Sequence, residues 1–192
     1  FYNVTNNKSI LLVTSGPSKN FVNDLMVKNN TEYEQSIEKI CKIVTSLGYK
    51  LVIKLHPSPF EVDVTTLVKK INPKITVIKS GNIFELINSS LVVIVIDIST
   101  AILESQILRK PVISISVKNY DWGLPTIFDS CLRTDVDNIG DLLDKVLKID
   151  DYKEKSNSMG IEYVNKYFSN QGNASTNLLD FLEKSFHLMN ND

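Results

Sequence analysis

Short apolar segments alternate with longer amphipathic segments through the first two thirds of the chain. Apolar, β-prone runs predict five strands, at 9–14, 50–55, 75–78, 91–96 and 111–115. Apolar residues at helical spacing predict helices between and after them, at 31–47, 62–71, 82–88, 99–108 and 137–147. The run 91–96 is apolar on both faces, which is typical of a central strand in a parallel sheet.

Strands and helices that alternate about every 20 residues are typical of βαβ units with right-handed crossovers. Two further amphipathic segments, 151–168 and 174–188, predict closing helices that pack across the sheet. We therefore expect one α/β domain over residues 1–192, with a Rossmann-like, doubly wound parallel sheet and closing C-terminal helices.

Charge and cysteine content exclude several classes of protein. Lys and Arg number 21 and Asp and Glu number 22, so the net charge of −1 offers no electrostatic basis for nucleic-acid binding. Cys41 and Cys131 are too few for a disulfide framework, and we expect both to be free thiols. No Cys/His cluster has metal-ligand spacing, and no acidic cluster suits magnesium, which favours metal-independent chemistry.

The longest apolar run, 91–96, is too short to span a bilayer, and no signal peptide is visible. The chain opens with Phe1 rather than Met, which suggests an excerpt of a longer protein.

Candidate chemistry lies in the turns after the strands, because ligands of doubly wound sheets bind beyond the carboxyl ends of the strands. After the first strand, Gly16 lets backbone N–H groups approach an anion, although a plain turn is an equal alternative. After the second strand, His56 is followed by Pro57 and can donate a hydrogen bond to a phosphate oxygen. A purely structural histidine is the alternative.

After the fourth strand, Asp97 leads into Ser99 and Thr100 at the start of a helix. Ser99 is a favourable N-cap, and the free N–H groups of a first helical turn attract anions. Glu104 falls on the same helix face, one turn further along, where it suits ribose hydroxyls better than phosphate. The alternative is a capped helix with a solvated glutamate. We expect Asp97, His56, Ser99, Thr100 and Glu104 to line one cleft.

Four segments in order resemble the C-terminal half of GT-B glycosyltransferases. They are Lys54-Leu-His-Pro57, Asp97-Ile-Ser-Thr-Ala-Ile-Leu-Glu104, Lys110-Pro-Val-Ile113 and Asn170-Gln-Gly-Asn-Ala-Ser175. The likeness spans residues 8–185 and is strongest to the bacterial and archaeal surface-polysaccharide group. That group includes the CDP-glycerol glycerophosphotransferases, capsule synthesis enzymes and bacterial sialyltransferases.

The resemblance implies roles for individual residues. His56 would be the catalytic residue that contacts the donor phosphate and stabilises the leaving nucleotide, and Glu104 would hold the ribose. The donor phosphates would be bound by Lys54, His56, Ser99, Thr100 and Gly16. Asn170 and Gln171 replace the acidic residue usual before Gly172, so a role there is in doubt. Tyr120 or Trp122 could stack on a base or pack under the closing helices.

The resemblance implies the donor-binding half of a transferase. A nucleotide-sugar or CDP-alcohol donor would pass its group to a surface-polysaccharide or lipid-linked acceptor, with no metal or cofactor. The general base and the acceptor site would belong to a missing N-terminal domain, so this chain alone should turn nothing over. We expect a cytoplasmic protein, and the lipid-linked acceptors of the group allow peripheral association with the inner membrane surface.

Two alternatives stay open. A UDP-N-acetylglucosamine 2-epimerase-like enzyme would share the fold. That family, however, tends to carry Ser-Gly-Gly or Ser-Ser-Gly and a Glu-Glu pair where this chain has Ser99-Thr100-Ala101 and a single Glu104. A non-catalytic α/β interaction domain would bind no nucleotide and would be insensitive to substitution of His56.

Overall fold

A six-stranded parallel sheet forms the centre of the computed structural model, which describes residues 9–15, 30–59, 61–117, 123, 125–170 and 172–189. The strand order is β3-β2-β1-β4-β5-β6, so β4 lies between β1 and β5 as its apolar pattern predicts. The strands are β1 (Ser9–Val13), β2 (Lys50–Lys54), β3 (Thr76–Ile78), β4 (Ser90–Ile96), β5 (Val112–Ile115) and β6 (Leu132–Thr134). The doubly wound α/β fold expected from the sequence is confirmed.

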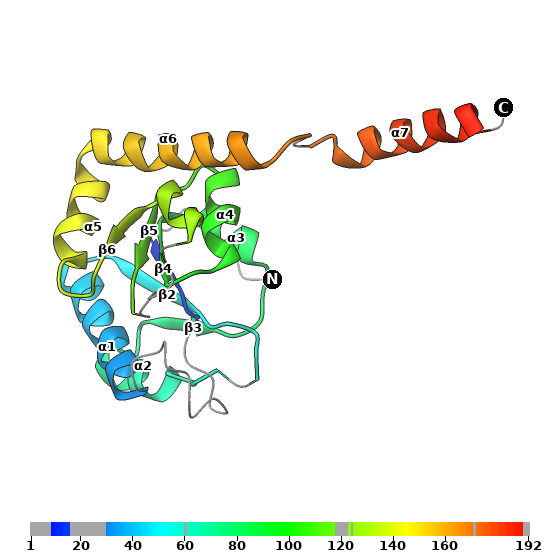
Figure 1. Ribbon diagram of the computed structural model, residues 1–192. Helices are drawn as coiled ribbons and strands as arrows, with labels where there is room; N and C mark the ends of the chain where they lie inside the picture. Colours follow the sequence, from blue (N-terminus) through cyan, green and yellow to red (C-terminus); the bar gives the residue numbers. More distant parts are fainter. Residues whose placement is uncertain are drawn as a thin grey trace.

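Helices cover both faces of the sheet and give the domain three layers (Figure 1). One face packs against α1 (Asn30–Ser46), α2 (Thr65–Ile71) and α5 (Ile139–Lys148). The other packs against α3 (Ile83–Ser89), α4 (Thr100–Ile107) and the 3-10 helix η1 (Thr126–Ser130). The sequence reading missed η1 and β6, because five and three residues are too few to show a period.

The first helix shows how the sequence directs this layering. Tyr33, Ile37, Ile40 and Val44 recur at helical spacing, and all four are at most 1% exposed on the inner side of α1. Gly48 follows the helix with φ +79°, a left-handed conformation that glycine adopts without steric cost. The predicted helix and its end are therefore confirmed.

Helix α6 (Asp150–Tyr167) packs against the amino edge of the sheet. Ser156 Oγ accepts a hydrogen bond from the N–H of Val112, the first residue of β5, at 3.0 Å. Gly160 lies so close to Gln106 of α4 that a Cβ atom built on the glycine would be 2.7 Å from Gln106 Cγ. The closing helix packs on the domain, but it lies along the amino edge of the sheet, opposite the carboxyl edge, and not across a face of the sheet as predicted.

Helix α7 (Ala174–Met189) departs from the prediction. It was expected to pack across the sheet, but Figure 1 shows it projecting beyond the domain in roughly the direction of α6. Its large apolar side chains are 40–65% exposed, namely Leu178, Leu179, Phe181, Leu182 and Phe186. Helix α6 has 18 residues, so it is about 27 Å long and already crosses the domain. Helix α7 continues in roughly the same direction and therefore extends past the edge of the domain.

Cys41 and Cys131 are free and buried, as expected. Burial raises the pKa of each thiol to about 12, so neither is a reactive thiolate at neutral pH. Among the described residues, no helix is long and apolar enough to cross a membrane.

Candidate ligand-binding cleft

A cleft of about 450 Å³ lies at the carboxyl edge of the sheet. Its walls come from the turns after β1, β2 and β3 and from the start of α4. The lining residues are Val13, Thr14, Ser15, Lys54, Leu55, His56, Pro57, Lys79, Ser80, Gly81, Ile83, Ile98, Ser99, Thr100, Ala101 and Glu104. The cleft straddles β1 and β4, where the strand order reverses, which is the usual ligand position in open α/β sheets.

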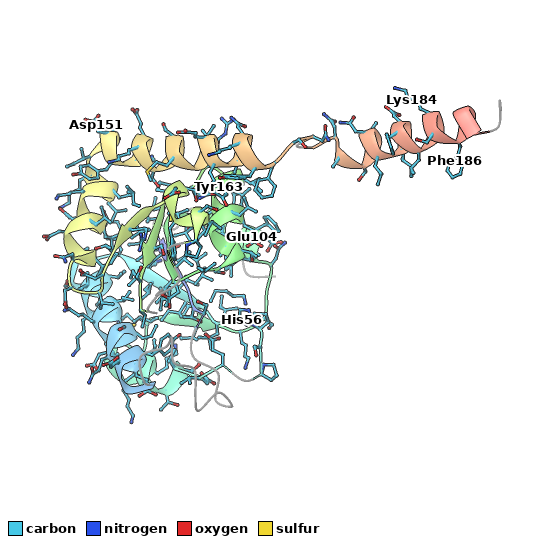
Figure 2. The ribbon with its side chains drawn as sticks, viewed as in Figure 1. His56, Glu104, Asp151, Tyr163, Lys184 and Phe186 are labelled. Atoms are coloured by element: carbon cyan, nitrogen blue, oxygen red, sulfur yellow. The ribbon has the colours of Figure 1, made fainter. Side chains whose placement is uncertain are left out.

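Most of the residues singled out in the sequence meet in this cleft. Lys54, His56, Ser99, Thr100 and Glu104 all line it, and Figure 2 shows His56 and Glu104 on the same side of the domain. Gly16 lies outside the described residues, as do Tyr120, Trp122 and Gln171. The shared cleft makes joint action possible, and the individual roles remain predictions.

Asp97 is not in the cleft, which corrects the expectation that it faces a ligand. The residue is 2% exposed and has φ +56°. Its Oδ1 accepts a hydrogen bond from the N–H of Val117 at 2.8 Å, and its own N–H donates to Ile115 O at 2.8 Å. The left-handed backbone directs the carboxylate inward, so Asp97 joins the β4 turn to the end of β5.

The start of α4 faces the cleft with polar groups. Ser99 is the N-cap, as the sequence predicts, and its Oγ accepts a hydrogen bond from the N–H of Ala101 at 3.3 Å. The Ser99 hydroxyl keeps its own proton to donate, and the Thr100 side chain is exposed beside it. Glu104 is half-buried, and its spacing of four residues from Thr100 puts it on the same face of α4, one turn along. Anion-compatible groups thus lie next to a carboxylate that can accept from hydroxyls.

His56 is exposed at the mouth of the cleft, on the turn that follows β2. Its Nδ1 accepts a hydrogen bond from the backbone N–H of Ser58 at 3.1 Å. This bond folds the ring back on its own turn, and the sequence reading did not anticipate it.

Lys54 is part of the cleft wall as well as a cation near its floor. The side chain is 7% exposed, and Nζ donates to Leu55 O at 2.8 Å and to Lys79 O at 3.0 Å. These bonds tie the turn after β2 to the turn after β3. An ammonium has three donors, so one remains for a ligand. Burial lowers the pKa of Lys54, against an opposing effect of the Glu61 carboxylate.

A buried carboxylate beneath the cleft escaped the sequence reading. Glu61 is 5% exposed, and its Oε1 accepts a hydrogen bond from Thr14 Oγ1 at 2.7 Å. Tyr33 lies close by, and burial together with the charge of Glu61 raises the pKa of the phenol. Glu61 therefore supplies negative charge close to the Lys54 ammonium, below the ligand space.

The turn after β3 was also missed as part of the site. Lys79, Ser80 and Gly81 of this turn line the cleft, together with Ile83 at the start of α3. Only the position of this turn could have indicated its role in the sequence, since it follows a strand at the same sheet edge as the turns after β1, β2 and β4. Leu55, Ile83 and Ile98 give the cleft apolar surface.

Solved structures that share this fold include an epimerase, a glycosyl transferase domain and a synthase. A UDP-GlcNAc 2-epimerase from Neisseria meningitidis, bound to UDP-GlcNAc, has 15% identity and a TM-score of 0.53 over 84% of this chain and 45% of its own. The C-terminal domain of a glycosyl transferase group 1 family protein from Francisella tularensis has 12% identity and a TM-score of 0.54 over 84% and 86%. Sucrose-phosphate synthase from Thermosynechococcus elongatus has 12% identity and a TM-score of 0.57 over 96% and 47%.

At these identities the likeness shows the fold alone, which is a Rossmann-like, doubly wound parallel sheet. The chain spans less than half the length of the epimerase and of the synthase, and most of the separate Francisella domain. No family model and no curated protein sequence matches the chain. In the part of the chain that the structure describes, no group of three or more His, Cys, Asp or Glu side chains could hold a metal ion.

Proposed function

We propose that this chain is the donor-nucleotide-binding half of a GT-B glycosyltransferase or glycerophosphotransferase. The observation that carries the proposal is the cleft at the strand-order reversal. It brings together a histidine, a capped helix start with two hydroxyls, and a carboxylate on the next turn of that helix. Proteins with this fold include glycosyltransferases and an enzyme bound to UDP-GlcNAc.

A nucleotide would bind with its phosphates against His56 and the start of α4, where the hydroxyls of Ser99 and Thr100 and the helix dipole favour negative charge. Glu104 would accept hydrogen bonds from the ribose hydroxyls. The base would pack on the apolar surface to which Leu55 and Ile83 contribute. The volume of about 450 Å³ lies within the range usual for small-molecule sites.

The chemical contribution of this half is stabilisation of the leaving group. When the bond between the donor group and the nucleotide phosphate breaks, the electron pair stays on the phosphate oxygen. His56 and the hydroxyls of Ser99 and Thr100 can donate hydrogen bonds to that developing charge. Such preorganised donors act without a metal, as the resemblance to the surface-polysaccharide group also implies.

Deprotonation of the acceptor hydroxyl needs a second group. Among the described residues that line the cleft, Glu104 is the single carboxylate, and it is assigned to the ribose. A base from another domain would complete the reaction, with a surface-polysaccharide or lipid-linked acceptor. Nucleotide-activated donors place such an enzyme in the cytoplasm, and a lipid-linked acceptor would bring it to the inner face of the membrane.

A UDP-N-acetylglucosamine 2-epimerase-like activity is the second candidate, and the fold shared with the Neisseria epimerase favours it. Both activities use a nucleotide in this cleft, so binding alone does not separate them. Product analysis of the protein that contains this chain does, because an epimerase changes its nucleotide sugar without an acceptor.

Calorimetric titration with CMP, CDP, UMP, UDP and GDP tests the nucleotide site. We expect one base to be preferred, and His56→Ala to weaken that nucleotide roughly ten- to hundredfold, because a hydrogen bond to a charged group contributes about 1.5–3 kcal/mol.

The matched control is His187→Ala, the same substitution at the other histidine, which lies in α7. It should leave binding unchanged. If a folded protein binds none of the five nucleotides at millimolar concentration, the donor-binding proposal is wrong for this chain, and the non-catalytic reading gains support.

A further inference from the structure

We infer that His56 acts in the cleft as a fixed hydrogen-bond donor through Nε2, and that Ser58 is the positioning residue that sets this tautomer through its backbone N–H. The part of this inference that concerns nucleotide binding, its ligand arm, rests on the proposed function. The part that concerns the tautomer of His56, its structural arm, can be tested in the protein without a ligand.

The hydrogen bond from Ser58 to His56 decides where the ring proton lies. Ser58 N–H donates to His56 Nδ1 at 3.1 Å, so Nδ1 is the acceptor of the ring. A neutral imidazole has one acceptor nitrogen and one N–H, and the N–H is therefore Nε2. Nε2 is on the far side of the ring from Nδ1, so the donor is directed away from the turn.

The sequence of the turn leaves little choice of partner for Nδ1. In His56-Pro57-Ser58-Pro59 both prolines lack a backbone N–H, so Ser58 has the single amide donor among the three residues after His56. Pro57 fixes its own φ, and Pro59 restricts Ser58 to extended conformations. Two prolines around one amide thus hold the donor in a narrow range of directions.

This arrangement suits a group that must stabilise developing negative charge. A donor whose tautomer and direction are set beforehand needs no reorganisation when charge appears on the leaving phosphate. Lys54 and Lys79 also line the cleft and supply cations there, and the contribution that the Ser58 hydrogen bond gives to His56 is a fixed direction of donation.

Long-range ¹H–¹⁵N correlation spectra of the imidazoles test the tautomer in the free protein. The spectra are recorded at mildly alkaline pH, where histidine in model peptides is neutral. His187→Gln identifies the His56 signals, because the chain has two histidines. We expect His56 to show a protonated Nε2 and an unprotonated Nδ1. An Nδ1–H tautomer, or a fast mixture of the two, overturns the inference.

Two substitutions of Ser58 test the positioning role. Ser58→Ala keeps the backbone N–H and should keep the Nε2–H spectrum. Ser58→Pro removes the N–H and should give a mixture of tautomers. Thermal unfolding of both variants shows whether the fold is intact. An unchanged tautomer in a folded Ser58→Pro protein would assign the role to another group.

Replacement of the ring tests which nitrogen the ligand uses. The glutamine amide nitrogen of His56→Gln can reach the position of Nε2, whereas that of His56→Asn reaches the position of Nδ1. For the nucleotide that the wild-type protein prefers, we expect His56→Gln to bind within about tenfold of wild type. His56→Asn should weaken it roughly ten- to hundredfold, as expected for a lost hydrogen bond to a charged group. The reverse order would contradict donation from Nε2.

The two arms fail separately. If the wild-type protein binds no nucleotide, the proposed function fails, and the spectra still decide whether Ser58 sets the tautomer. If the nucleotide binds and His56 is the Nδ1–H tautomer, the proposed function stands and this inference is overturned.

Discussion

Asp97 stabilises the turn after β4 through both its backbone conformation and its side chain. Its φ of +56° is a conformation that Asn and Asp tolerate better than most side chains, and its carboxylate is nearly inaccessible. The backbone and the side chain act together, because the turned backbone brings Oδ1 to the N–H of Val117. This anchor precedes Ser99 by two residues, so it holds the start of α4 at the cleft without touching a ligand.

Substitution of Asp97 should therefore affect stability before binding. Asp97→Ala leaves the buried N–H of Val117 without its partner and places alanine at positive φ. We expect a loss of about 2–4 kcal/mol in the free energy of unfolding, measured by urea denaturation. Asp97→Asn keeps both an acceptor oxygen and the tolerance of positive φ, and should lose about 1 kcal/mol or less. Equal stability of the two variants would contradict the anchoring role.

Lys54 likewise has a structural role in addition to the binding role expected of it. The resemblance to GT-B glycosyltransferases implies that Lys54 binds a donor phosphate, and its side chain lies in the cleft wall. Two of its three donors are nevertheless used on the carbonyls of Leu55 and Lys79. A lysine that holds two turns together also fixes the distance between them, so its contribution to binding is partly one of shape.

At the scale of elements, the contact between α4 and α6 determines how the C-terminal part closes the domain. Gly160 of α6 allows the helix to approach Gln106, whose Nε2 donates to Ser130 O at 2.9 Å on η1. Ser156 ties the same helix to the start of β5. One small residue and two hydrogen bonds thus connect α4, α6, η1 and the sheet.

Two glycine substitutions separate close packing from helix propensity. In Gly160→Ala, the new methyl group would lie 2.7 Å from Gln106 Cγ, so we expect a net loss of about 1–3 kcal/mol in unfolding free energy. In Gly140→Ala of α5, the nearest atom is Ile43 Cγ2 at an ordinary 3.5 Å, and helix propensity should give a gain of about 0.5–1 kcal/mol. Chemical denaturation measures both. A stabilised Gly160→Ala protein would show that Gln106 moves aside at little cost.

At the scale of the whole molecule, α7 stands apart from the domain. Figure 2 shows Lys184 and Phe186 on opposite sides of this helix, so it is amphipathic in the usual way. Its apolar side is exposed, whereas the domain proper has two well-buried clusters on the faces of its sheet. The stability of the domain should therefore depend little on this helix.

Removal of residues 170–192 tests this independence. We expect the free energy of unfolding to change by about 1 kcal/mol or less, because side chains that remain exposed contribute little burial energy. Binding of the dye ANS, which reports exposed apolar surface, should fall. Urea denaturation of the full chain and the shortened chain makes the comparison. A loss of several kcal/mol would mean that α7 packs against the domain in solution.

The sequence by itself determined the class of fold and the edge at which the cleft lies. Alternating apolar runs and helical periods depend on neighbours in the chain, so β1 to β5 and α1 to α6 could be located from residue order. Because parallel strands end at one edge of a sheet, the sequence predicts that His56 and Ser99 lie near each other. The short β6 and η1 escaped because they are too brief to show a period.

Only the tertiary structure decided the direction of individual side chains. Asp97 turns inward, Lys54 bonds to two turns, and Glu61 lies beneath the floor, because each of these outcomes depends on groups distant in the sequence. The projection of α7 is of the same kind. An amphipathic pattern states that a helix has an apolar side, and the lengths and directions of other elements decide whether a surface lies opposite it.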